Sequence, residues 1–162
     1  MIRRREVTEP QGLFHPCRAY SYAALAFLAH TVELMSGLPG WLASRQASVA
    51  ITEAQISQAS IWIALGAMAV FMVGRTVTNR PVQIAVAVVT GFVLARVVTL
   101  TALSLATWSY VPGTATALAL VLPAGLWLYR NLPLADPARL AAAGAGVLAF
   151  APLTWAALWV AS

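Results

Sequence analysis

The stretch LAHTVELM, residues 28–35, decides how the chain can fold, because it places a histidine and a carboxylate inside an apolar segment. His30 and Glu33 are three residues apart, so a helix carries them on one face. The surrounding segment runs from Ala19 to Leu38, and about 20 mainly apolar residues are what a membrane-spanning helix needs. We therefore expect a spanning helix that takes a polar pair into the membrane.

The composition extends this expectation to the whole chain. Of the 162 residues, 60% are hydrophobic and 9% are charged, whereas a soluble domain carries about a quarter charged residues. So few charges cannot give a protein of this size a wetted surface, and hydrocarbon must be the solvent for most of it. The absence of lysine and the abundance of alanine are typical of a GC-rich bacterial genome. We expect an all-α, polytopic helix bundle integral to the bacterial inner (plasma) membrane.

Five segments qualify as candidate transmembrane helices, with four as the alternative count because the fourth is short. Pro39 is expected to stop the first helix, and Thr52 with Gln55 forms a capping-box pattern before the second. Pro123 and Pro152 predict kinks in the fourth and fifth. The expected helices lie at about 19–38, 53–76, 81–104, 114–130 and 138–160, in a single transmembrane domain (19–162) that follows a cytoplasmic tail (1–18).

The arginines predict the orientation. All ten cationic side chains are arginines, and one of them, Arg96, lies within an apolar segment. If the N-terminus is cytoplasmic, only Arg45 lies outside, as the positive-inside rule predicts. The scattered arginines form no basic face, so we expect no nucleic-acid partner. The arginines expected on the inner side are Arg3, Arg4, Arg5, Arg18, Arg75, Arg80, Arg130 and Arg139.

Glu33 and Arg96 share the same predicted depth. Glu33 lies 14 residues beyond Ala19, and Arg96 lies 15 residues beyond Pro81. At 1.5 Å per residue, both are roughly 21–23 Å from the inner ends of their helices. Because an isolated charge in hydrocarbon is unfavourable by at least ~2.5–3.5 kcal/mol, we expect the two to form an ion pair between the first and third helices.

We expect a wider intramembrane polar cluster around this pair, formed by His30, Glu33, Gln58, Arg96 and Thr99. Three readings stay open at this point. The pair can lock two helices together, it can belong to a functional site reached from outside, or the arginine can snorkel outward without a partner. Exchanging the two charges distinguishes the first reading from the second.

Small residues are concentrated in AAAGAGVLA, residues 141–149. Ala142 and Gly146 form a small-xxx-small pair, a spacing that lets helix backbones approach closely. The alternative is that alanine and glycine are simply abundant in this chain.

The residue inventory excludes several classes of chemistry. Without lysine the chain cannot form a retinal or pyridoxal Schiff base, and its single cysteine, Cys17, cannot form a thiol pair or a cysteine zinc site. Two histidines do not readily supply two axial haem ligands. The chain has no phosphate-binding P-loop, no G-x-S-x-G and no H-E-x-x-H. The sequence therefore disfavours a self-contained enzyme and assigns no catalytic residue, cofactor or metal ligand.

Two segments carry a family resemblance. IWIALGAMAVFMVGR (61–75) looks like a helix that ends in Gly-x-x-x-Arg-like residues, and GFVLARVVTL (91–100) looks like a following helix that carries a buried arginine. In this order they resemble uncharacterised small four-helix proteins of the bacterial inner membrane that are loosely grouped with the DoxX-like families. The resemblance covers roughly residues 50–130, and this chain adds a fifth candidate helix. It implies a helical membrane fold and no established activity.

Three functions are consistent with this sequence. The first is an accessory or assembly subunit of a larger membrane complex, because the segments outside the apolar helices are short. The second is a small oligomeric transporter or channel that uses the His/Glu/Arg cluster, and the third is a membrane enzyme or lipid-binding protein for an apolar substrate. The expected partners are membrane lipids and either other membrane subunits or copies of the chain.

Overall fold

The computed structural model describes residues 16–44 and 52–161, and every regular element in that part is a helix. The all-α prediction is thus confirmed. Three helices are long and apolar enough to cross a membrane: α2 (Glu53–Thr76), α3 (Arg80–Ala106) and α6 (Asp136–Val160). The spanning of the other expected segments and the side of each terminus stay predictions. The tail residues 1–15, with three of the inner arginines, and Arg45 lie outside the described residues.

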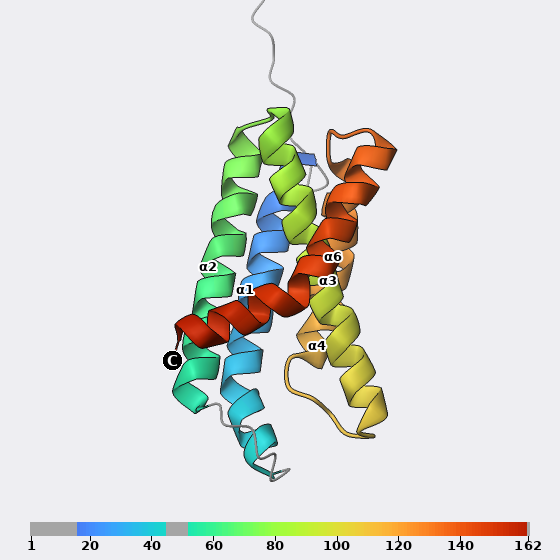
Figure 1. Cartoon of the computed structure of the whole chain (residues 1–162). Helices are drawn as coiled ribbons and strands as arrows, with labels where there is room; N and C mark the ends of the chain where they lie inside the picture. Colours follow the sequence, from blue (N-terminus) through green and yellow to red (C-terminus); the bar gives the residue numbers. More distant parts are fainter. Residues whose placement is uncertain (1–15, 45–51, 162) are drawn as a thin grey trace, which may run out of the picture.

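The fourth helical stretch lies between two helices that run in parallel. Figure 1 shows α1 (Pro16–Ser44) and α3 running in the same direction, with α2 antiparallel to both. The fourth stretch consists of α4 (Thr114–Thr116), η1 (Ala117–Val121) and α5 (Leu122–Asn131), and it contacts both α1 and α3. Between α1 and α3 themselves there is little or no direct backbone contact. The two helices meet through side chains instead, as Leu34 of α1 and Leu100 of α3 do in one buried cluster.

Local signals set the starts of α2 and α3 where the sequence predicts them. The Thr52 hydroxyl accepts a hydrogen bond from the Gln55 N–H at 3.2 Å, and the Gln55 side chain accepts one from the Thr52 N–H at 2.7 Å. This completes the capping box at α2. At α3 the Asn79 carbonyl oxygen accepts from the Val82 N–H at 3.1 Å, with Pro81 in the first turn.

The first helix is longer than predicted. It continues through Pro39 to Ser44, so the expectation that Pro39 stops it is wrong. On either side of the proline, Leu38 and Trp41 pack against the buried side chains of a small cluster formed by Leu34, Leu100 and Val111. This tertiary contact outweighs the backbone hydrogen bond that proline removes.

Prolines shape the last two helical stretches. The fourth runs without a break from Thr114 to Asn131, but its turn at Ala117–Val121 is a wide π-turn just before Pro123. Such a turn is one of the recognised ways of disturbing a helix near a proline. In α6, which contains Pro152, the C-terminal half drawn in red bends away and ends beside α2 (Figure 1). The bend agrees with the predicted kink.

Small residues let α6 lie directly on α3. Ala142, Ala143 and Gly146 are buried in this interface. A Cβ atom added at Gly146 would overlap the carbonyl oxygen of Val88, and one added at Gly91 would overlap that of Ala143. The two backbones are thus in contact, which confirms the packing role of the small-xxx-small pair.

We predict that Gly146→Ala destabilises the protein and that Gly144→Ala does not. Both changes gain helix propensity, up to about 1 kcal/mol. At Gly144 the new methyl group meets nothing within 4 Å, whereas at Gly146 it must push α6 away from Val88, which should cost about 1–3 kcal/mol. Thermal unfolding of the purified variants in mild detergent measures the difference. Equal midpoints would show that the helices do not touch at Gly146.

Candidate functional site

The polar face of α1 meets the start of the fourth helical stretch. Glu33 is half-buried, and its carboxylate accepts three hydrogen bonds. One oxygen accepts from the Tyr110 hydroxyl, and the other accepts from both the hydroxyl and the backbone N–H of Thr116, the latter at 3.1 Å. All of these donors lie at least 77 residues further along the chain, so the carboxylate joins two distant parts of the fold.

Glu33 acts as a helix cap supplied by another helix. The first N–H groups of a helix lack partners within it, and the helix dipole favours a negative charge there. The residue before α4 is Gly113, which provides no side-chain cap, and the first turn contains no acidic residue. The carboxylate of Glu33 therefore takes the place that a capping side chain would otherwise fill.

His30 contacts the same turn at the start of α4. It is 1% exposed, and its Nδ1 lies 3.1 Å from the carbonyl oxygen of Gly113 and 3.3 Å from the Thr116 hydroxyl. Because a carbonyl can only accept, Nδ1 carries the ring proton. In the neutral ring, Nε2 is then a bare acceptor. This Nε2 is buried and has no hydrogen-bond partner within the described part of the chain.

Gly113 is required where it stands. Its φ of +92° lies in the left-handed region that side chains with a Cβ avoid. A Cβ there would also come within 3.0 Å of the His30 ring and 3.1 Å of the Leu34 side chain. On its other side, the His30 ring lies near the Phe27 ring, with centroids 5.9 Å apart. The imidazole is thus enclosed between an aromatic ring and a turn that only glycine can make.

Arg96 does not form the predicted ion pair with Glu33. The guanidinium makes no hydrogen bond or salt bridge among residues 16–44 and 52–161, although the side chain is only 8% exposed. Tyr110 and Thr116 occupy both oxygens of Glu33. Arg96 instead lies within electrostatic reach of the His30 ring. The prediction failed because the Tyr110 hydroxyl and the hydroxyl and backbone N–H of Thr116 already bind the carboxylate.

The other two predicted members lie outside this site. Gln58 is exposed on α2. Thr99 is also exposed, and its hydroxyl donates to the Ala95 carbonyl of its own helix at 2.9 Å. Within the described ranges, no group of three histidine, cysteine or acidic side chains is placed to hold a metal ion. The site that the structure assembles consists of His30, Glu33, Tyr110, Gly113 and Thr116, with Arg96 beside it.

The comparison with protein families adds a finding about this same face. A family model described as a protein of unknown function with HXXEE motif matches residues 22–128. The chain belongs to the HXXEE family. No curated protein and no solved structure matches the chain. Nothing in these comparisons supports the grouping with the DoxX-like proteins.

The HXXEE motif can be located on α1. His30 is the only histidine within residues 22–128, so the histidine of the motif can only be His30. Glu33 then corresponds to the first glutamate, and Leu34 stands where the second would be. Leu34 is 2% exposed and belongs to the apolar cluster with Leu100 and Val111. The chain thus keeps the two motif residues that bind the fourth stretch and replaces the third by a core residue.

A second polar network, at the other end of the bundle, was not predicted. Gln83 of α3 is fully buried, and its amide nitrogen donates to the carbonyls of Gly74 and Val77 at 2.9 and 2.8 Å. Its carbonyl oxygen accepts from the Tyr20 hydroxyl at 2.7 Å. Because both amide protons and the oxygen are used, this network closes the end of α2 and leaves nothing for a ligand.

We predict that Glu33→Gln lowers the pKa of Tyr110. The hydrogen bond to the Glu33 carboxylate is the main reason why this pKa is raised above its ordinary value, with desolvation and the negative charge adding to it. Because the folded-state pKa exceeds the unfolded value of about 10, the contact stabilises the fold below that pH, and this is lost as pH rises through the raised pKa. Absorbance titration of each protein against its Tyr110→Phe counterpart isolates the group. An unchanged midpoint in Glu33→Gln would contradict the assignment.

Proposed function

We propose that the chain is an accessory or assembly subunit of a larger complex in the bacterial inner membrane, with its N-terminus in the cytoplasm. The observation that supports this is an apolar groove of about 400 Å³ between α2, α3 and the C-terminal half of α6. Its polar surface is almost nil, so it suits a hydrocarbon partner rather than a soluble one. The groove is lined by Trp62, Ile63, Gly66, Ala67, Val88, Val89, Phe92, Leu153, Ala156, Ala157 and Val160.

The small residues of this groove suit a partner's spanning helix. Gly66 is exposed, and a Cβ added there would meet nothing within 4 Å. Together with Ala67, Ala156 and Ala157 it lowers the floor of the groove, and such surfaces let another helix approach closely in a membrane. We therefore propose a helix of a partner subunit as the occupant.

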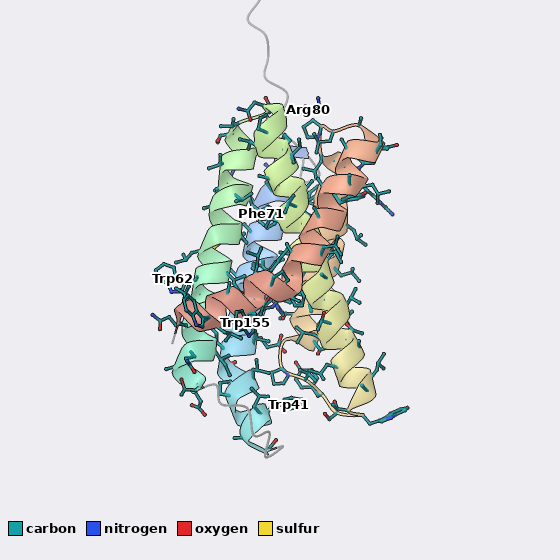
Figure 2. The ribbon with its side chains drawn as sticks, viewed as in Figure 1. Trp41, Trp62, Phe71, Arg80 and Trp155 are labelled. Carbon is teal, nitrogen blue, oxygen red and sulfur yellow. The ribbon has the colours of Figure 1, made fainter. Side chains whose placement is uncertain are left out.

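Tryptophans flank this region at mid-height. Figure 2 shows Trp62 on α2 and Trp155 on α6 between the end of the bundle marked by Arg80 and the end marked by Trp41. The two side chains are 56% and 70% exposed. In membrane proteins tryptophans gather at the lipid–water interfaces, and they are also enriched at the centres of protein contacts. Because Trp62 and Trp155 are exposed away from both ends of the bundle, their position favours a protein contact over a lipid–water interface.

We predict that Gly66→Leu releases the partner and that Gly144→Leu does not. Both glycines have open space for a side chain, so neither change should disturb the fold, but only Gly66 lines the groove. Leucine at Gly66 fills the floor and should weaken binding at least about tenfold. The measurement is quantitative mass spectrometry of what co-purifies with each protein in mild detergent.

Two outcomes would remove the proposal. One is a chain that purifies alone or only with copies of itself. The other is a partner retained equally by Gly66→Leu and Gly144→Leu, because the contact would then lie elsewhere.

A second candidate function is a small oligomeric transporter or channel. It is favoured by the buried charge of Arg96 near His30, a charge that has no ion-pair partner among residues 16–44 and 52–161, since intramembrane ionisable groups commonly mark ion pathways. We expect ion flux into liposomes to fall in Arg96→Ala and in Glu33→Gln, compared at several pH values. Flux that neither substitution changes would exclude these residues from a transport mechanism.

A further inference from the structure

His30 and Arg96 lie in a polar layer between two apolar ones. Leu34 of α1 and Leu100 of α3 belong to one buried cluster with Val111. Both helices run in the same direction, so one turn deeper on each stand His30 and Arg96 (Figure 1). Deeper still, Phe27 and Phe92 belong to the main hydrophobic core. Each of the two residues stands one turn from a leucine of the shared cluster, so both lie on the sides of α1 and α3 that approach each other, with apolar side chains above and below.

This layer carries a positive charge that no described carboxylate balances. The guanidinium of Arg96 is protonated at any ordinary pH. In the described part of the chain the carboxylate side chains are Glu33, bound to Tyr110 and Thr116, Glu53, exposed at the start of α2, and Asp136, paired with Arg139. A charge buried among apolar side chains is strongly unfavourable unless it is paired. The part of the fold that the structure describes does not supply this partner for Arg96.

The layer also has unfilled hydrogen-bonding capacity of two opposite kinds. Arg96 offers five N–H donors and can accept nothing. His30 Nε2 is an acceptor, because Nδ1 holds the ring proton against the Gly113 carbonyl. A group that fits between must accept from Arg96 and donate to His30.

Three kinds of small occupant can be compared on these terms. A water molecule accepts and donates but leaves the charge uncompensated. A halide or nitrate ion balances the charge but offers no proton to Nε2. An oxyanion that keeps one O–H does both, and its paired oxygens match the planar fork of the guanidinium. The site must be small, since only 8% of the Arg96 side chain is accessible.

We propose that His30 and Arg96 bind a small protic oxyanion of the bicarbonate class between α1 and α3. The anion accepts hydrogen bonds from Arg96 and donates its O–H to His30 Nε2. The hydrogen bonds that His30 and Glu33 make to the α4 turn keep the imidazole in the required tautomer. This site stands apart from the proposed subunit role, because it lies inside the bundle and needs no partner.

The test is the anion dependence of thermal unfolding of the purified full-length chain in mild detergent, followed by tryptophan fluorescence. Sodium bicarbonate replaces sodium gluconate at constant sodium concentration and constant, mildly alkaline pH, in sealed vessels. Sodium nitrate is the matched comparison, because nitrate is planar and singly charged but has no proton. We expect a saturable rise in the unfolding midpoint of about 5 °C at a hundredfold excess over the dissociation constant, and less than half that rise with nitrate.

Two variants locate the effect. Arg96→Met removes the charge while keeping a long apolar side chain, and it should abolish the bicarbonate response. Arg75→Met is the control, since Arg75 is exposed at the other end of the bundle, where it donates to Ser21, and it should keep the full response. If Arg96→Met fails to fold, the comparison of bicarbonate with nitrate on the unmodified chain still tests whether the site prefers a protic oxyanion. The proposal is overturned by equal stabilisation by nitrate, by no response to bicarbonate up to about 100 mM, or by a full response in Arg96→Met.

Discussion

The hydrogen bonds from the start of α4 to the carboxylate of Glu33 are the constraint on which the rest of this structure depends. They draw the fourth helical stretch against α1, and the same stretch also contacts α3. In doing so they use up the carboxylate of Glu33, and Arg96 has no acidic partner among the described residues. They also fix the position of Gly113, whose carbonyl sets the tautomer of His30. The helix cap and the unpaired charge are two results of one contact.

The sequence predicts the elements of this fold well where a local signal controls them. The capping box of Thr52 and Gln55 gives the start of α2, and Asn79 with Pro81 gives the start of α3. The same reasoning fails at Pro39, because the packing of Leu38 and Trp41 carries α1 past a residue that locally favours a stop. Helix ends that depend on tertiary contacts cannot be read from the residues around them.

In the candidate site, too, the features set by local sequence were predicted and those set by tertiary contacts were not. Counting residues from the helix starts places Glu33 and Arg96 at one depth, whereas the structure brings Leu34 and Leu100 into one cluster, so the residues one turn before them, His30 and Arg96, share a level. The predicted partner of Glu33 was wrong because the pairing considered only charged side chains, whereas the start of a helix also offers backbone N–H donors to a carboxylate. Tyr110 and Thr116 follow α3 and have no periodic relation to α1. The one available signal was a helix start at Gly113 without an acidic first turn, which implies a cap from elsewhere.

One substitution within the HXXEE motif has a wider consequence. A member of the family with glutamate at the position of Leu34 would carry a carboxylate one turn from His30, on the side of α1 that faces Gly113 and Leu100. In such a protein the counter-ion would be part of the polypeptide and permanent. With leucine there, the described part of this chain offers Arg96 no carboxylate, and its counter-ion would have to come from the surrounding solution. The folded state would then sense a solute, so a residue that looks like ordinary core packing would determine whether the protein responds to its environment.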